Sequence, residues 1–252
     1  MWSLYDELIE GIPHELTVDA LICGANNALV KSGTGYGTGG MLNQNWRSEL
    51  LPKKSLGMPL RDLAACIKSW NCIEACVGLA AINSYYNEIE RVRSLGVNVS
   101  PAMKVEDRAN DPFISSQNAV RRKKVTIIGH FSYIDKLFAP ICDMSIIEKF
   151  DPLEGDYPDE AADYLLPESD FVFISSYTLA EKSLPRFLQL AKDAYITVVG
   201  PATTLSPVLH RHGVNNLSGF VIKDGQSAVD ASIGLGGNIH ATGQKVSFRA
   251  ED

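Results

Sequence analysis

The sequence predicts an α/β protein in which a small α+β domain precedes a domain built on a parallel β-sheet. In residues 123–237, short apolar runs alternate with amphipathic helical segments, which is the pattern of βαβ units whose sheet is covered on both faces. In residues 14–87, short strands come first and a pair of helical segments follows, which is typical of an α+β domain.

The smaller domain begins with an amphipathic helical pattern over residues 2–12. The stretch "HELTVDALICGANNALVKSG" predicts two short strands with a turn near "GANN". The run "GTGYGTGG" (33–40) is not followed by Lys-Ser/Thr, so it is not a Walker loop, and we expect a mobile hairpin or lid. Helices are predicted over 60–69 and over 71–87, the second with Asn71 as its N-cap.

A polar segment, 94–112, contains Pro101 and Pro112 and predicts the domain boundary. It divides residues 1–100 from residues 101–252. The second part contains five apolar runs: "KKVTIIGHF", "CDMSIIEKF", "DFVFISSY", "AYITVVG" and "LSGFVIKD". We expect them to form a parallel sheet of five or six strands.

Composition excludes some classes of function. The net charge is −7 with no long Lys/Arg run, which is unsuited to coating nucleic acid. No apolar run approaches the roughly 18 residues that span a bilayer, and the acidic N-terminus lacks a signal peptide's basic start. We therefore expect a cytoplasmic protein with a small-molecule ligand and no nucleic-acid or membrane partner. The sequence allows a homo-oligomer.

Five cysteines, an odd number, argue against a disulfide framework. Cys72 and Cys76 lie four residues apart with Cys66 nearby. A soft-metal patch is one interpretation, but buried core thiols are favoured because no CxxC pair or histidine accompanies them.

Ligands of a doubly wound sheet bind beyond the carboxyl ends of its strands. The first strand ends in "GHFSYI" without the GxGxxG fingerprint, so an NAD dehydrogenase is not expected. Glu148 follows the second strand, 19 residues after Gly129, where a carboxylate either binds ribose hydroxyls or is a solvated loop acid.

The loop after the fourth strand has a defined turn chemistry. Gly200 permits a sharp turn, Pro201 fixes its direction, Thr203 supplies a hydroxyl, and Ser206 is a natural N-cap. Such a loop offers free N–H groups to an anionic ligand. The alternative is an ordinary strand-to-helix connection.

Five segments resemble one known family: "WSLYDELIEGIP", "LRDLAACIKSWNCIEACVGLAAIN", "VTIIGHF", "LLPESDFVFISSYTL" and "VVGPATTLSPVLHRHGV". They are similar to the "putative heavy-metal chelation" family, domain of unknown function 364 preceded by domain of unknown function 4213. The resemblance implies an enolase-N-terminal-like α+β domain (1–100), followed by a Rossmann-like domain (101–252) similar to methyltransferases. It also implies a site between the domains and a role with a metal-chelating compound such as a pterin, flavin or siderophore-like molecule.

The residues that match the family pattern are Asn83, Gly129, His130, Glu148, Gly200, Pro201 and Thr203. In the leading hypothesis, His130 transfers protons, because the unperturbed pKa of histidine lies near working pH, and the other six residues bind ligand. For Asn83, at the end of an apolar helix, a backbone carbonyl is the alternative partner. The chain departs from the pattern at Glu181-Lys182-Ser183, where relatives have Asn-Gly-Thr, and at Ala202, where they have serine. Both changes are expected to remove polar groups from the pocket rim.

The leading hypothesis is a small-molecule enzyme or enzyme-like protein. In it, the turn 129–131 and the loop 200–206 face each other across one pocket, roofed by the first domain through Asn83. The first alternative is a non-catalytic binder of a metal or metal–chelate complex. The second is an S-adenosylmethionine-dependent methyltransferase-like protein, for which the first loop has few glycines. The sequence names no cofactor or substrate and leaves open whether a metal binds the protein.

Overall fold

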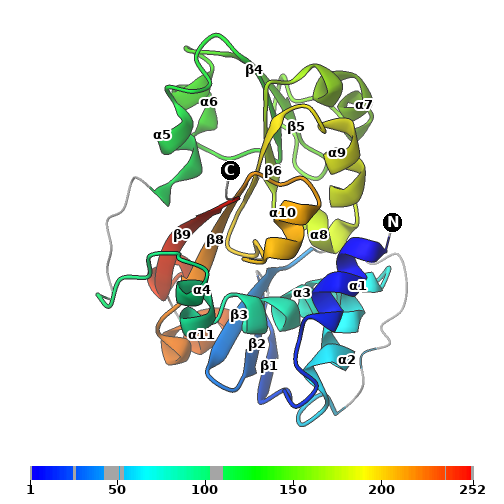
Figure 1. The fold of residues 1–252 in the computed structure, drawn as a ribbon, viewed down its shortest axis with the longest axis vertical. Helices are drawn as coiled ribbons and strands as arrows, with labels where there is room; N and C mark the ends of the chain where they lie inside the picture. Colours follow the sequence, from blue (N-terminus) through cyan, green and yellow to red (C-terminus); the bar gives the residue numbers. More distant parts are fainter. Residues whose placement is uncertain are drawn as a thin grey trace.

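The computed structural model describes residues 2–24, 27–42, 51, 54–102, 110–235 and 237–250. The chain is an α/β protein with a small antiparallel sheet and helices in its N-terminal part, followed by a mostly parallel six-stranded sheet (Figure 1). The predicted fold class is therefore confirmed at this level. The turn residues 25 and 26, and residues 103–109 of the predicted boundary, lie outside the described residues.

The N-terminal sheet has three antiparallel strands in the order β1-β2-β3. Their bounds are β1 Ala20–Cys23, β2 Asn27–Ser32 and β3 Gly35–Gly40. The helices of this part are α1 Ser3–Glu10, α2 Leu60–Ala64, the 3-10 helix η1 Ala65–Lys68, α3 Cys72–Tyr86 and α4 Ile89–Ser94. The predicted cap is present, since the Asn71 side chain accepts a hydrogen bond from the N–H of Glu74 at 3.2 Å.

For residues 33–40 the sequence predicted a mobile hairpin or a lid. The structure shows the hairpin and not a lid, because this run supplies the turn and the second strand, β3, of the antiparallel β2–β3 pair. Its glycines allow α3 to pack directly on the strand. A Cβ at Gly37 would lie 2.0 Å from the backbone N of Ser84, and one at Gly39 would lie 2.1 Å from the carbonyl oxygen of Cys76. The glycine run thus serves close packing of a strand and a helix.

The larger sheet has the order β5-β4-β6-β7-β8-β9. Its strands are β4 Lys124–Ile128, β5 Asp143–Ile147, β6 Phe171–Ser175, β7 Tyr195–Val199, β8 Asn216–Ile222 and β9 Gly243–Arg249. β4 to β8 are parallel, as predicted, and β9 pairs with β8 in the antiparallel direction as an edge strand that the sequence did not predict.

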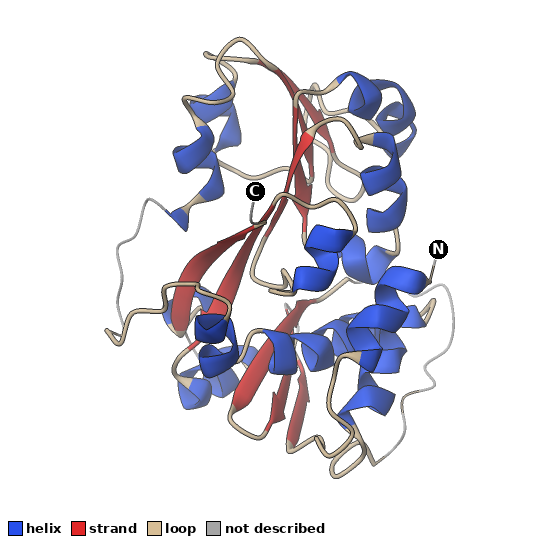
Figure 2. Ribbon diagram, in the orientation of Figure 1, coloured by secondary structure: helices blue, strands red, loops and turns tan. Residues whose placement is uncertain are grey.

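Helices cover both faces of this sheet (Figure 2). One face carries α5 Pro112–Ser116 and α6 Ile134–Phe138, and the other carries α7 Ala162–Leu165, α8 Tyr177–Glu181, α9 Leu184–Leu190 and α10 Pro207–Arg211. The 3-10 helices η3 Asp159–Ala161 and η4 Leu166–Glu168 flank α7. Before β9 come α11 Gly225–Ser232 and the 3-10 helix η5 Ile239–Ala241.

One buried core joins the two parts of the chain. Leu4 and Leu8 of α1 belong to the same hydrophobic cluster as Leu209 of α10 and Val246 of β9. Tyr5 donates a hydrogen bond from its hydroxyl to the carbonyl oxygen of Leu179, at 3.1 Å. The division at residue 100 stays a prediction. Among the described helices, none is long and apolar enough to cross a membrane.

Candidate functional site

Two glycine turns lie at the carboxyl edge of the parallel sheet. Because β5 and β6 lie on opposite sides of β4, the carboxyl ends of β4 and β6 form the topological switch point of the sheet. Gly129 follows β4 with φ +97°, and Gly200 follows β7 with φ +136°. A Cβ at Gly200 would lie 2.4 Å from Oγ of Ser176. Both strand ends therefore use a backbone conformation that favours glycine.

The larger cavity at this edge, the aromatic cavity, has a volume of about 310 Å³. Its described lining residues are Pro112, Phe131, Tyr133, Val199, Gly200, Pro201, Ser218, Gly219, Phe220, His240 and Lys245. Small-molecule sites have volumes of roughly 300–1,000 Å³, so this cavity suits a molecule of one or two rings.

Aromatic rings reach the aromatic cavity from two separated strands. Phe131 and Tyr133, after β4, pack on Phe113 of α5 with ring centroids 4.9 and 5.7 Å apart. Phe220 of β8 packs edge-on against His240, with centroids 5.9 Å apart. β6 and β7 lie between β4 and β8, and neighbouring strands are about 4.8 Å apart. The two ring pairs therefore stand on different sides of the cavity, with the glycine-proline turn between them.

Ser218 places a hydroxyl in the wall of the aromatic cavity. It lies on a central strand and is 4 % exposed, at a position where sheets of this kind normally carry an apolar side chain. Among the described residues, no hydrogen bond is made to its Oγ. Ser218 pairs with Ser247 and Phe220 with Lys245 across β8 and β9, so these four side chains share one face. The Ser218 hydroxyl is thus available to a ligand.

An ion pair lies at the rim of the aromatic cavity. Oδ1 of Asp111 accepts two backbone N–H groups of α5, and Oδ2 accepts the Tyr133 hydroxyl at 3.0 Å and pairs with Nζ of Lys245 at 3.3 Å. The Lys245 side chain remains 48 % exposed. Burial and the Asp111 charge raise the pKa of Tyr133, while burial and the Lys245 charge lower the pKa of His240. Both rings are therefore uncharged at neutral pH.

A smaller cavity of about 50 Å³, the switch-point cavity, lies on the α8/α9 side of the sheet. It is lined by Ile128, Gly129, Ile147, Glu148, Lys149, Phe150, Asp159, Ser175, Tyr177, Thr178, Glu181 and Phe187. Burial raises the pKa of Glu181 to about 7, against the opposing charge of Lys149. The Ser183 hydroxyl donates a hydrogen bond to Oε2 of Glu181 at 3.3 Å. A carboxyl group with this pKa can give or accept a proton near neutral pH.

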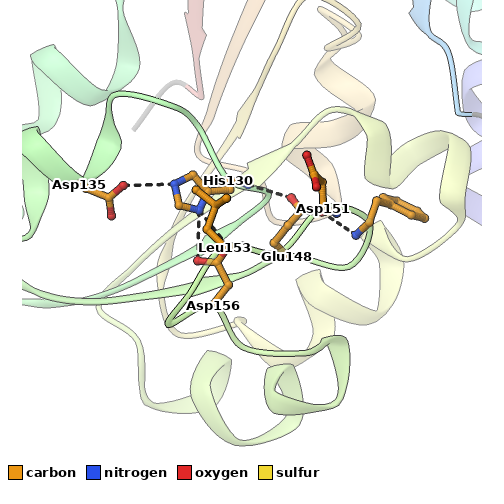
Figure 3. A network of polar contacts seen from close by, with 7 residues as sticks. His130, Asp135, Glu148, Asp151, Leu153 and Asp156 are labelled. Atoms are coloured by element: carbon orange, nitrogen blue, oxygen red, sulfur yellow. Dashed lines mark hydrogen bonds and ion pairs between the residues drawn. The ribbon is translucent and has the colours of Figure 1, made fainter.

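His130 lies in a cluster of acids (Figure 3), not among the described lining residues of either cavity. Its Nδ1 is 2.9 Å from Oδ2 of Asp156, and its Nε2 is 3.1 Å from Oδ2 of Asp135. Burial lowers the pKa of His130, but the hydrogen bonds and charges of Asp156 and Asp135 outweigh it and raise the pKa above the usual value. This geometry favours a protonated, structural histidine, and its role in proton transfer stays a prediction.

Glu148 uses its carboxylate to hold backbone N–H groups (Figure 3). Its Oε2 accepts from the N–H of His130 at 2.9 Å, and its Oε1 accepts from the N–H of Phe150 at 2.7 Å. Glu148 therefore joins the turn after β4 to the loop after β5. Its side chain also lines the switch-point cavity, and ribose binding there stays a prediction.

Asn83 and Thr203 lie between the two parts of the chain, and both are fully buried. Nδ2 of Asn83 donates to the carbonyl oxygens of Thr38 and Ala202, at 2.8 and 2.9 Å. Its Oδ1 accepts from the Thr204 hydroxyl at 2.6 Å. The amide thus supports the loop after β7 from the N-terminal side, which fits the backbone-partner interpretation. In the part of the chain that the structure describes, Oγ1 of Thr203 has no hydrogen-bond partner.

The predicted site residues are therefore distributed over several places. Gly200 and Pro201 line the aromatic cavity with Phe131 of the predicted turn, whereas Gly129 and Glu148 line the switch-point cavity. Glu181, where the chain departs from the family pattern, places a carboxyl group in the lining of the switch-point cavity. Lys182 instead donates from Nζ to the carbonyl oxygens of Ser69 and Ala180, and so ties α8 to the N-terminal part.

Sequence reasoning missed Ser218, Phe220, His240 and Lys245. The signal at Ser218-Gly219 was present, because a polar residue and a glycine interrupt an otherwise apolar strand. His240 and Lys245 had no comparable signal, since they enter through η5 and an edge strand that the sequence did not predict.

The described residues contain no group of three or more His, Cys, Asp or Glu side chains that could hold a metal ion. All five cysteines are free thiols. Burial raises the pKa of Cys66 to about 11 and that of Cys76 to about 12. Of the three clustered cysteines, Cys76 is buried as the core-thiol interpretation expects, whereas Cys66 and Cys72 are half-buried.

The fold and its cavities define the class: an α/β protein with ligand-sized space at the carboxyl edge of a mostly parallel sheet. The chain belongs to the family DUF364, described as "Putative heavy-metal chelation", whose model matches residues 111–251. A second model with the same description, DUF4213, matches residues 5–86. The resemblance inferred from the sequence is therefore confirmed.

Two solved structures are similar over almost the whole chain. A DUF364 protein of unknown function from Desulfitobacterium hafniense DCB-2 shares 45 % identity with a TM-score of 0.91, and the match covers 99 % of each chain. A DUF364 protein of unknown function from Pyrococcus horikoshii shares 19 % identity with a TM-score of 0.77, covers 98 % of each chain, and supports the fold alone. No curated protein matches this chain.

Proposed function

We propose that this protein binds a small organic molecule in the aromatic cavity and takes part in making or handling a metal-chelating compound, such as a pterin, flavin or siderophore-like molecule. The observation that carries the proposal is the aromatic cavity itself. It combines ligand-sized space, aromatic walls and the buried Ser218 hydroxyl at the carboxyl edge of the sheet. The family description supplies the link to metal chelation.

The proposal assigns the metal to the ligand, because the described side chains form no metal-binding group. It also includes the finer fold assignment, with an enolase-N-terminal-like first domain and a Rossmann-like second domain. In this account, Gly200 and Pro201 form the wall of the ligand site. Asn83 acts by holding the adjacent loop through Ala202.

Acid–base catalysis is a second candidate function, favoured by Glu181. Its carboxyl group faces the switch-point cavity and has a pKa of about 7. The cavity's volume of about 50 Å³ has room for one or two water molecules, each of which occupies about 30 Å³ in the liquid.

The test is a ligand-observed NMR screen of the intact protein against pterins, flavins and fragments of siderophores. We expect at least one compound to bind, and we expect Ser218→Leu, which fills the aromatic cavity, to abolish its binding. Circular dichroism and thermal melting establish that the variant is folded. If no compound binds, or if folded Ser218→Leu binds as well as the wild type, the proposal is wrong.

A further inference from the structure

We infer that the ligand of the aromatic cavity is an aromatic molecule of one or two rings that carries a carboxylate, with the ring between the two aromatic walls and the carboxylate at Lys245. This inference rests on the proposed function and narrows the class of compound. It also distinguishes the aromatic cavity from the switch-point cavity, whose lining includes three acids, Glu148, Asp159 and Glu181, together with Lys149.

The ring requirement follows from the walls. Phe131 and Tyr133 present rings from the turn after β4, and Phe220 presents a ring from β8. Phe113 supports the first two, and His240 supports the third. Aromatic pairs favour stacked or edge-to-face arrangements and gain more than area burial alone. A flat ring therefore uses this cavity better than an aliphatic chain of equal volume.

The requirement for an acceptor group follows from the donors at the cavity. Ser218 lines the cavity, and its hydroxyl has no hydrogen-bond partner among the described residues. Lys245 has three N–H groups, and its described contact with Asp111 uses one of them. A ligand carboxylate at Lys245 would form a charge-assisted hydrogen bond, which is stronger than a bond between neutral groups.

The charges at the rim fit a ligand with one negative charge. Asp111 is already engaged by two N–H groups of α5 and by the Tyr133 hydroxyl. Those bonds stabilise its carboxylate without removing its charge, so Asp111 and Lys245 form a neutral ion pair in which Lys245 still has N–H groups for an incoming acceptor. His240 is uncharged at neutral pH, because burial and Lys245 lower its pKa. A ligand with a single carboxylate can pair with Lys245. The described lining residues include no second Lys or Arg for a further negative charge.

The experiment compares 2-naphthoate with its neutral isostere 2-naphthamide by NMR titration at low salt and pH 7.5. We expect naphthoate to bind about five-fold more tightly, a modest factor because Lys245 is half exposed. Lys245→Met should bring the ratio to one or below, because Asp111 then lacks its counter-charge at the rim. Phe220→Leu should weaken both probes. The control is Lys124→Met, which removes another exposed, ion-paired lysine. Lys124 is the first residue of β4, so it lies at the amino end of that strand, away from the carboxyl edge. Lys124→Met should keep the wild-type ratio.

The outcomes separate this inference from the proposed function. Equal binding of both probes, or a ratio unchanged by Lys245→Met, overturns the inference and leaves ligand binding in the aromatic cavity intact. If neither probe binds, while a compound of the broader screen binds in a manner that Ser218→Leu abolishes, the inference is again overturned and the proposed function stands. Failure of the proposed function is shown by the broader screen alone.

Discussion

The Thr204 hydroxyl donates a hydrogen bond to Oδ1 of Asn83 across 2.6 Å, and this bond joins the loop after β7 to helix α3 of the N-terminal part. The same amide donates to the carbonyl oxygens of Thr38 and Ala202. One buried side chain therefore fixes the loop that begins with the glycine-proline wall of the aromatic cavity.

Asn83→Leu should lower the free energy of unfolding by about 3 kcal/mol or more, because three buried polar groups lose their partner. Urea denaturation measures this change. The control is Asn98→Ala, which removes an exposed amide and should change stability by less than about 0.5 kcal/mol. Equal effects of the two substitutions would show that the Asn83 amide does not stabilise the contact between α3 and the loop after β7.

Gly200→Ala should destabilise the protein by about 2 kcal/mol or more. Alanine at this position would have to adopt φ +136°, and its Cβ would lie 2.4 Å from Oγ of Ser176. Ser176→Ala removes that oxygen, so the double variant should lose less stability than the sum of the two single variants. Strictly additive losses in a urea-denaturation cycle would contradict the close contact between these two residues.

The pH dependence of stability should contain a contribution from His130. Asp156 and Asp135 raise its pKa in the folded state, so the stabilisation is fully present below the unfolded value of about 6.5 and is lost as pH rises through the folded pKa. His130→Gln and Asp156→Asn should both flatten the decline of the urea midpoint above pH 6.5. His14→Gln, at an exposed site, is the control. If the urea midpoint of His130→Gln declines above pH 6.5 as steeply as that of the wild type, His130 is not the source of the pH dependence.

Glu181 should also lower stability as pH rises, but over a more acidic range than His130. Burial raises its pKa from 4.5 to about 7, so the folded state favours the protonated carboxyl group. Stability should fall as pH rises from 4.5 to 7 and stay reduced above it. The melting temperature of Glu181→Gln should therefore compare more favourably with that of the wild type at pH 8 than at pH 5. The exposed Glu154→Gln should show no such gain.

The sequence predicted the parallel strands because each is a short apolar run bounded by polar or turn residues. It did not predict β3, since β3 packs against the backbone of α3 and glycine lacks the usual strand signal. β9 was missed because "GQKVSFR" is a half-exposed edge strand with weak alternation. Long-range packing, which local patterns do not report, defines both strands.

The candidate site was predictable at the glycine-proline turn and much less so elsewhere. Gly200 and Pro201 follow a strand end, where topology alone places ligands. The ring walls come from Phe131 and Phe220, which no sequence period connects. His130 showed a different limit, because its neighbours Asp135 and Asp156 became visible only once the loops were placed.

The central claim, that the aromatic cavity is a ligand site, is tested most directly by crystals of the protein soaked in a mixture of one- and two-ring aromatic compounds. The account predicts electron density for a ring between Phe131 and Phe220, with a polar atom of the compound within hydrogen-bonding distance of Oγ of Ser218. Density for bound compounds only at other places, with this cavity holding water alone, would contradict it.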